Sequence, residues 1–186
     1  MKIKKIIALC KSSKRLFLYD ISKDRPQMLS DEKAAYFLEE CPRFTINSLY
    51  TTYDISEKQA EKIVSGIRGG EPEGYNISDC DEDEVLCEPF SISIASCGKQ
   101  YRAYKTSEGV AFVDEKYFAP FEGDCDYFEI YERRRTDGQI YFAVKIGLYL
   151  KAIILPTSDD IDMEDISLEL GELFNLCRVR AENRKV

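Results

Sequence analysis

Histidine and tryptophan are both absent from this chain of 186 residues. Without histidine, the chain cannot build a Ser-His-Asp or Cys-His arrangement, and it lacks the side chain that most often serves as a general base. The glycine-rich phosphate loops of nucleotide-binding proteins are also missing, and the pair Gly69-Gly70 leads directly into Glu71. We therefore expect a non-catalytic protein that uses no cofactor.

Long apolar runs are missing as well. No stretch approaches the roughly 20 residues that a transmembrane helix needs. The start of the chain is basic and then apolar, but the apolar run from Ile6 to Cys10 is short and Lys11 follows it at once. We therefore expect no signal peptide, no membrane association and a cytoplasmic location.

The cysteines point to a reducing compartment. Their number, seven, is odd, and none forms the C-x2-C pair of a zinc site or a redox motif. Cys10 and Cys177 fall on apolar faces of predicted helices, where cysteine acts as a small core residue. A zinc site from Cys80, Cys87 and Cys97 is the less favoured alternative, so no bound metal is predicted.

The charges are unevenly distributed along the chain. The formal net charge is −8, and acidic residues dominate the ranges 71–88 and 159–172. The basic residues that crowd the first fifteen positions are Lys2, Lys4, Lys5, Lys11, Lys14 and Arg15. An acidic surface repels DNA, because DNA affinity comes largely from lysine and arginine contacts with phosphates. A role in DNA binding therefore requires these cations to gather on one face.

Composition and periodicity predict an α+β protein with a mostly antiparallel sheet. Tyrosine, phenylalanine and β-branched residues favour strands, and the hydrophobic fraction of 44% is that of a globular protein. Ile3, Ile6, Ile7 and Cys10 recur at helical spacing. Predicted helices cover 3–13, 45–66 and the C-terminal 162–182. Predicted strands cover 15–20, 27–30, 34–40, 90–96, 100–106, 110–113, 127–134, 139–146 and 148–156.

We divide the chain into a helix-and-strand unit over 1–66, an acidic loop or linker over 67–89, and a β-rich unit with a C-terminal helix over 90–186. The first and last of these can also form one domain. Within the β-rich unit, Asp137-Gly138 between two alternating runs predicts a hairpin.

Two stretches share an order of elements. Residues 110–156 contain the strand VAFV, the short helix DEKYFAP and three strands that end in AIILP, and residues 1–40 follow a similar order. This βαβββ order resembles the DNA sliding clamps, the processivity factors of polymerases, which are built from pairs of such units. In its general character the chain also resembles small phage and prophage proteins. The resemblance implies a clamp-like fold of two βαβββ-like units, a ring-like homo-oligomer, and a polymerase or other replication protein as partner.

The basic N-terminal helix is the first candidate site. The resemblance to clamps implies that Lys4, Lys5, Lys11, Lys14 and Arg15 face the phosphates of double-stranded DNA without reading its sequence. The alternative is a solvated helix face that balances a negative protein.

Arg133, Arg134 and Arg135, next to the predicted hairpin turn, form the second candidate. Three guanidinium groups can hold a phosphate or the carboxylates of a partner, although strand alternation lets at most two of them share a surface. The alternative is a charged edge that discourages strand pairing.

The acids of range 79–84 predict an acidic loop. They lack the spacing of an EF-hand and the separate rigid elements of a two-metal nuclease. The leading hypothesis is therefore a clamp-like DNA-associated factor. A protein–protein interaction module (a phage adaptor, inhibitor or assembly factor) comes second, and a metal-dependent nuclease comes third.

Overall fold

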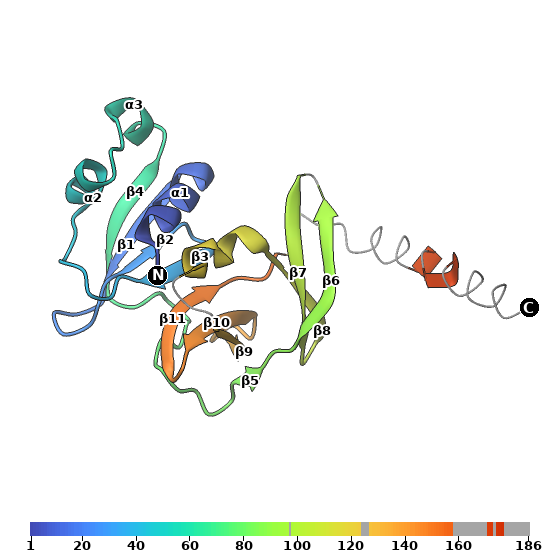
Figure 1. Ribbon diagram of the computed structural model, residues 1–186. Helices are drawn as coiled ribbons and strands as arrows, with labels where there is room; N and C mark the ends of the chain where they lie inside the picture. Colours follow the sequence, from blue (N-terminus) through green and yellow to red (C-terminus); the bar gives the residue numbers. More distant parts are fainter. Residues whose placement is uncertain (97, 124–126, 158–170, 173, 177–186) are drawn as a thin grey trace, which may run out of the picture. The chain divides into compact units, whose positions relative to one another are not determined.

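The structure is a computed structural model that describes residues 1–96, 98–123, 127–157, 171–172 and 174–176 (Figure 1). The chain divides into two compact units, Met1–Pro156 and Thr157–Val186, and each is described by itself. In the second unit, residues 171–172 and 174–176 are helical, and the rest of the predicted helix over 162–182 lies outside the described residues.

The first unit combines helices with strands, which confirms the predicted α+β class. Its helices are α1 (Ile3–Ser13), α2 (Ile46–Thr52), α3 (Glu57–Ala60) and the 3-10 helix η1 (Glu115–Phe121). The strands of the N-terminal part are β1 (Arg15–Asp20), β2 (Met28–Ser30), β3 (Ala34–Phe37) and β4 (Val64–Gly69). The later strands are β5 (Val85–Leu86), β6 (Pro89–Ser96), β7 (Lys99–Thr106), β8 (Gly109–Asp114), β9 (Glu129–Arg134), β10 (Ile140–Ile146) and β11 (Tyr149–Ile154).

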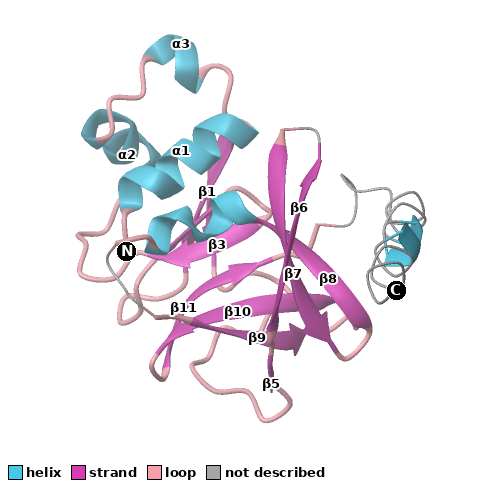
Figure 2. Cartoon of the chain, turned by 45° about the vertical axis from the view of Figure 1, so that its right-hand side comes forward, coloured by secondary structure: helices cyan, strands magenta, loops and turns pink. Residues whose placement is uncertain are grey.

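One large sheet joins the two ends of this unit. Its strand order is β4-β1-β2-β3-β11-β10-β9-β5, and a smaller sheet has the order β6-β7-β8 (Figure 2). All neighbours in both sheets are antiparallel except β1 and β4, which run parallel. The sheet is therefore mostly antiparallel, as the sequence predicts, and strands from 1–66 and from 127–156 share it.

The large sheet has two similarly connected halves. In one half α1 is followed by β1, β2 and β3, and in the other η1 is followed by β9, β10 and β11. The last strands of the two halves, β3 and β11, pair antiparallel at the middle of the sheet, where Ala35 lies opposite Ile153. The second half is preceded by β8, whereas α1 begins at Ile3. The described halves therefore share a helix and three strands.

The main core lies between this sheet and the helices α1 and η1. Alternate strand residues such as Leu16, Leu18 and Phe142 meet Ile6 and Cys10 of α1 in one cluster. The two helices contact each other, and Lys2 N–H, just before α1, donates to the carbonyl of Pro120 over 2.8 Å. Both helices lie on the same side of the sheet (Figure 2).

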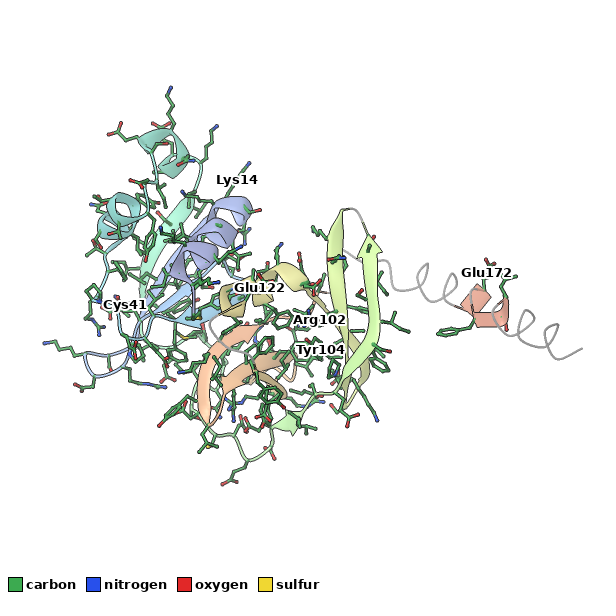
Figure 3. The ribbon with its side chains drawn as sticks, viewed as in Figure 1. Lys14, Cys41, Arg102, Tyr104, Glu122 and Glu172 are labelled. Carbon is green, nitrogen blue, oxygen red and sulfur yellow. The ribbon has the colours of Figure 1, made fainter. Side chains whose placement is uncertain are left out.

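The smaller sheet packs against this core through β7. Arg102 and Tyr104 both project from β7 toward η1 (Figure 3). The Tyr104 ring lies 6.1 Å from that of Phe118 and 5.6 Å from that of Phe142, between centroids. The guanidinium of Arg102 lies 5.4 Å from the centre of the Phe118 ring and forms an ion pair with Glu115.

The opposite face of the large sheet has its own cluster. The strand residues that alternate with the first set, among them Met28, Phe37 and Tyr141, pack against Ile77. Ile77 belongs to the acid-rich segment and is only 2% exposed. The interpretation of 67–89 as a solvated loop or linker is therefore wrong for this part, because the segment covers one face of the sheet.

The predicted helix over 45–66 is also wrong in extent. This part of the chain instead forms α2, α3 and then β4. Strand β4 pairs with β1, from Val64 opposite Arg15 to Gly69 opposite Asp20. The capping box of Ser56 and Gln59 is present, but it starts only one helical turn. The following residues become a strand because β1 offers a row of backbone hydrogen bonds.

Candidate functional site

The exposed face of α1 carries only basic and small residues. Ile6, Ile7, Leu9 and Cys10 are buried against the sheet. The exposed residues of the helix are Lys4, Lys5, Ala8, Ser12 and Ser13, and Ile3 and Lys11 are half-buried. No acidic residue occurs between Ile3 and Ser13. The helical period therefore gathers three lysines on one side of the helix.

Lys14 ends this helix. It is the C-cap, with φ of 58°, and its backbone N–H donates to the carbonyls of Cys10 and Lys11. Its side chain is exposed and stands at the end of α1 (Figure 3). A cation at this position also interacts favourably with the negative end of the helix dipole.

A cleft of about 310 Å³ separates α1 from the residues after α2. Lys4 and Lys11 line one side of the cleft, and Tyr53 and Asp54 line the other. The Lys11 ammonium lies 3.5 Å from the Tyr53 carbonyl oxygen, so this lysine is partly tied to the protein. Lys4 and Lys5 are the more exposed pair on the helix.

Arg15 does not join the lysines of α1. It lies in β1, where strand alternation places it on the face opposite to Leu16 and Leu18, which pack under α1. Its guanidinium forms an ion pair with Glu32, which also pairs with Arg68 over 2.8 Å. Assigning Arg15 to the same surface as Lys4, Lys5, Lys11 and Lys14 is therefore wrong.

The three consecutive arginines have three different environments. The Arg133 side chain is fully buried and donates to Glu84 and to the carbonyls of Asn76 and Ser78. Arg134 is half-exposed and forms an ion pair with Glu108 over 2.7 Å. Arg135 stacks on Tyr75, with its guanidinium 4.8 Å from the ring centre. The predicted contact with a phosphate or partner is wrong for Arg133, because its donors are already occupied inside the protein.

The acids of range 79–84 hold the loop to the sheet. Asp79 accepts from the Leu150 backbone N–H over 2.9 Å, and Asp81 accepts from the Asn76 side chain over 2.7 Å. Glu84 forms ion pairs with Arg133 and Lys145. Within the described ranges, no three His, Cys, Asp or Glu side chains are grouped as a metal site. The acidic segment lies on the sheet face opposite to α1.

A buried polar cluster lies beneath α1 and η1, and no sequence signal marked it. Asp31 is 3% exposed and accepts from the backbone N–H groups of Lys33 and Ala34, at 3.0 and 2.9 Å. The Tyr117 hydroxyl donates to the other carboxylate oxygen of Asp31 over 3.3 Å. Burial raises the pKa of Asp31, against the lowering effect of these hydrogen bonds. Burial also raises the pKa of the neighbouring Tyr36 well above its usual value.

Comparisons with known proteins assign the chain to no family. No protein-family model, no curated protein and no solved structure matches it. In the part of the chain that the structure describes, no helix has both the length and the apolar character needed to cross a membrane. Function is therefore inferred from the charge and geometry of the described residues.

Proposed function

We propose that this protein is a non-catalytic, clamp-like DNA-associated factor that presents α1 to double-stranded DNA. In this proposal it acts in the cytoplasm as a homo-oligomer, with a polymerase or another replication protein as its partner. Contact is sequence-independent, because lysine side chains on α1 meet phosphates rather than base edges.

The observation that carries this proposal is the basic outward face of α1. The outward face of α1 bears Lys4, Lys5 and the half-buried Lys11, with no acidic residue in the helix. The acid-rich segment that contains Ile77 lies against the other face. A chain of net charge −8 can approach a polyanion only through such a basic surface.

The paired halves of the sheet support the same proposal. α1 and η1 contact each other on the same side of the sheet, and each is followed in the chain by three antiparallel strands. In a ring of such units, helices on this side would face the enclosed duplex. On η1 the cation is Lys116, whose ammonium lies 2.8 Å from Asp114, so α1 supplies the greater part of the positive charge.

Binding of this kind is weak for a single copy and depends strongly on salt. Each lysine–phosphate contact releases condensed counterions, and the logarithm of the affinity falls by about 0.9 per contact for each tenfold rise in salt. Topological closure around the duplex, rather than local affinity, would then keep an oligomer on DNA.

The test is duplex binding measured against salt, with two variants of equal charge change. Lys4→Glu/Lys5→Glu reverses two exposed cations of α1, and Lys23→Glu/Lys105→Glu reverses two exposed cations elsewhere. We expect the α1 variant to lose binding and the control to keep most of it. Equal loss in both variants would show a nonspecific charge effect and would contradict the assigned face.

The oligomeric state is tested separately by light scattering over a range of concentrations. The proposal requires a defined oligomer, and a monomer at every concentration would overturn the ring. A stable complex with another protein that survives Lys4→Glu/Lys5→Glu would favour an interaction module. Mg²⁺-dependent cleavage of DNA that is lost in Asp81→Ala would favour a nuclease.

A further inference from the structure

The sheet face opposite to α1 contains a pocket of about 240 Å³. The segment around Ile77 covers part of this face, and the pocket lies next to that segment. Among the apolar residues that line it are Ala35 and Ile153, the partners at the junction of β3 and β11. The pocket therefore lies where the two halves of the sheet meet.

Aromatic rings hold arginines on two sides of this pocket. The Arg68 guanidinium lies 3.9 Å from the centre of the Phe17 ring and donates to the Tyr19 hydroxyl over 2.8 Å. The Arg135 guanidinium stacks on Tyr75, and both of these residues line the pocket. Stacking fixes the direction of a guanidinium fork, so less entropy is lost when the fork binds an anion.

Arg135 is the less satisfied of the two. Its ion pair with Asp137, which is about half-exposed, spans 3.3 Å, so solvent screens it. Its Nε atom is buried and has no hydrogen-bond acceptor among the residues that the structure describes. Its Nη1 atom donates to Gln139 over only a long contact of 3.4 Å, so the terminal nitrogens of this guanidinium retain donor capacity. By contrast, Arg68 already pairs with Glu32 over 2.8 Å.

We propose that this pocket binds a monocarboxylate of about the size of one amino-acid residue, with an apolar carbon chain. The carboxylate accepts from Arg135, and the chain contacts Ala35 and Ile153. This site is independent of α1 and of DNA, since it lies on the other face of the sheet.

Size and charge select this class of ligand. A volume of about 240 Å³ lies below that of pockets for drug-sized molecules, so it suits a residue-sized group better than a nucleotide. Three cations line the pocket (Lys33, Arg68 and Arg135), but Glu32 and Glu73 line it too. A single negative charge is accommodated there more easily than the double charge of a phosphate.

Two sources can supply such a group: a free carboxylic acid or the carboxy-terminal residue of another chain. The probes are N-acetyl-leucine, its amide N-acetyl-leucinamide, 4-methylpentanoate, the tripeptide Ala-Ala-Leu and inorganic phosphate. Each is titrated into the full chain, isotope-labelled for NMR, and the amide shifts of the pocket residues are followed. For fragments with so few atoms we expect affinities on the order of millimolar.

We expect N-acetyl-leucine to shift the pocket amides and N-acetyl-leucinamide to leave them unmoved. Tighter binding of Ala-Ala-Leu would identify a chain terminus as the source, and preference for 4-methylpentanoate would identify a free acid. Either result supports the carboxylate site. Phosphate binding without carboxylate binding, or no shift with any probe, would overturn it.

Variants assign the effect to the pocket. Arg135→Gln should weaken N-acetyl-leucine binding on the order of tenfold, the effect of losing a charged hydrogen bond. Arg134→Gln changes the same charge one residue away, outside the pocket lining, and should bind like the parent chain. Glu73→Gln removes a negative charge from the lining and should strengthen binding. Unchanged affinity in both Arg135→Gln and Glu73→Gln would overturn the assignment.

Discussion

The guanidinium of Arg133 donates from Nε to the carboxylate of Glu84 over 2.8 Å, deep in the protein. The Arg133 side chain is fully buried and that of Glu84 is 14% exposed. The same guanidinium donates to the carbonyls of Asn76, Ser78 and Asp79, at 3.0, 2.8 and 3.3 Å. One side chain of β9 therefore anchors the acid-rich segment across the sheet.

Replacing Arg133 should strongly destabilise the protein. Arg133→Gln leaves the Glu84 carboxylate with only Lys145 and takes a donor from the Asn76, Ser78 and Asp79 carbonyls, of which Asn76 keeps the Tyr141 hydroxyl. This should cost about 3–5 kcal/mol in the free energy of unfolding. Urea denaturation measures this loss. Arg133→Lys keeps the charge but has no planar fork, so it should recover only part of the stability. Full stability in Arg133→Lys would show that charge alone matters here.

Gly74→Ala should destabilise more than Gly70→Ala. Both glycines have positive φ, 83° at Gly74 and 86° at Gly70, so alanine at either costs about 1–2 kcal/mol in backbone strain. A Cβ on Gly74 would also lie 3.1 Å from Thr136 Oγ1, whereas a Cβ on Gly70 has nothing within 4 Å. Thermal unfolding of the two variants compares them, and equal losses would show that the hairpin moves to make room.

Asp31→Asn should remove part of the pH dependence of stability. Burial raises the folded-state pKa of Asp31 above the usual value of an aspartate. Its contribution to stability is therefore fully present below that value and is lost as the pH rises through the raised pKa. Relative to the parent chain, Asp31→Asn should gain stability between about pH 3 and pH 7. Denaturant unfolding at both pH values measures the gain, with the exposed Asp24→Asn as the control.

If the difference between Asp31→Asn and the parent chain is the same at both pH values, ionised Asp31 carries no penalty. The hydrogen bonds from Lys33, Ala34 and Tyr117 would then fully replace the lost solvation of the carboxylate.

Cysteine reactivity should follow burial in the native state. Cys80 is exposed, whereas Cys10 and Cys87 are buried. Burial raises the pKa of Cys87 to about 11 and also raises that of Cys10, and only a thiolate reacts readily. Among these three, Cys80 should be alkylated first by iodoacetamide, as mass spectrometry with site assignment can show. Denaturant should abolish the difference, and equally rapid labelling of Cys10 in the native protein would contradict its placement.

Short-range patterns predicted a substantial part of this fold. The spacing of Ile6, Ile7 and Cys10 predicts both the helix and its buried face, and the same period places Lys4 and Lys11 on its outer side. Asp137-Gly138 predicts the hairpin, in which Gly138 has φ of 85°. These features could be predicted because the residues that determine them are a few positions apart.

The features that the sequence did not reveal depend on contacts between distant segments. Val64–Gly69 follow a helix signal, yet they form a strand because β1, about fifty positions earlier, lies alongside. Arg133, Arg134 and Arg135 look alike in sequence, yet only Arg135 lines the pocket.

The sequence by itself determined the α+β class, the helix α1 and its basic face, because helical period and turn chemistry are local. Only the tertiary structure decided which face of the sheet the acids cover, that Arg133 is buried, and where Arg68 and Arg135 meet around a pocket. Those outcomes depend on strand order, and strand order is set by the burial of apolar faces contributed by segments far apart in the chain.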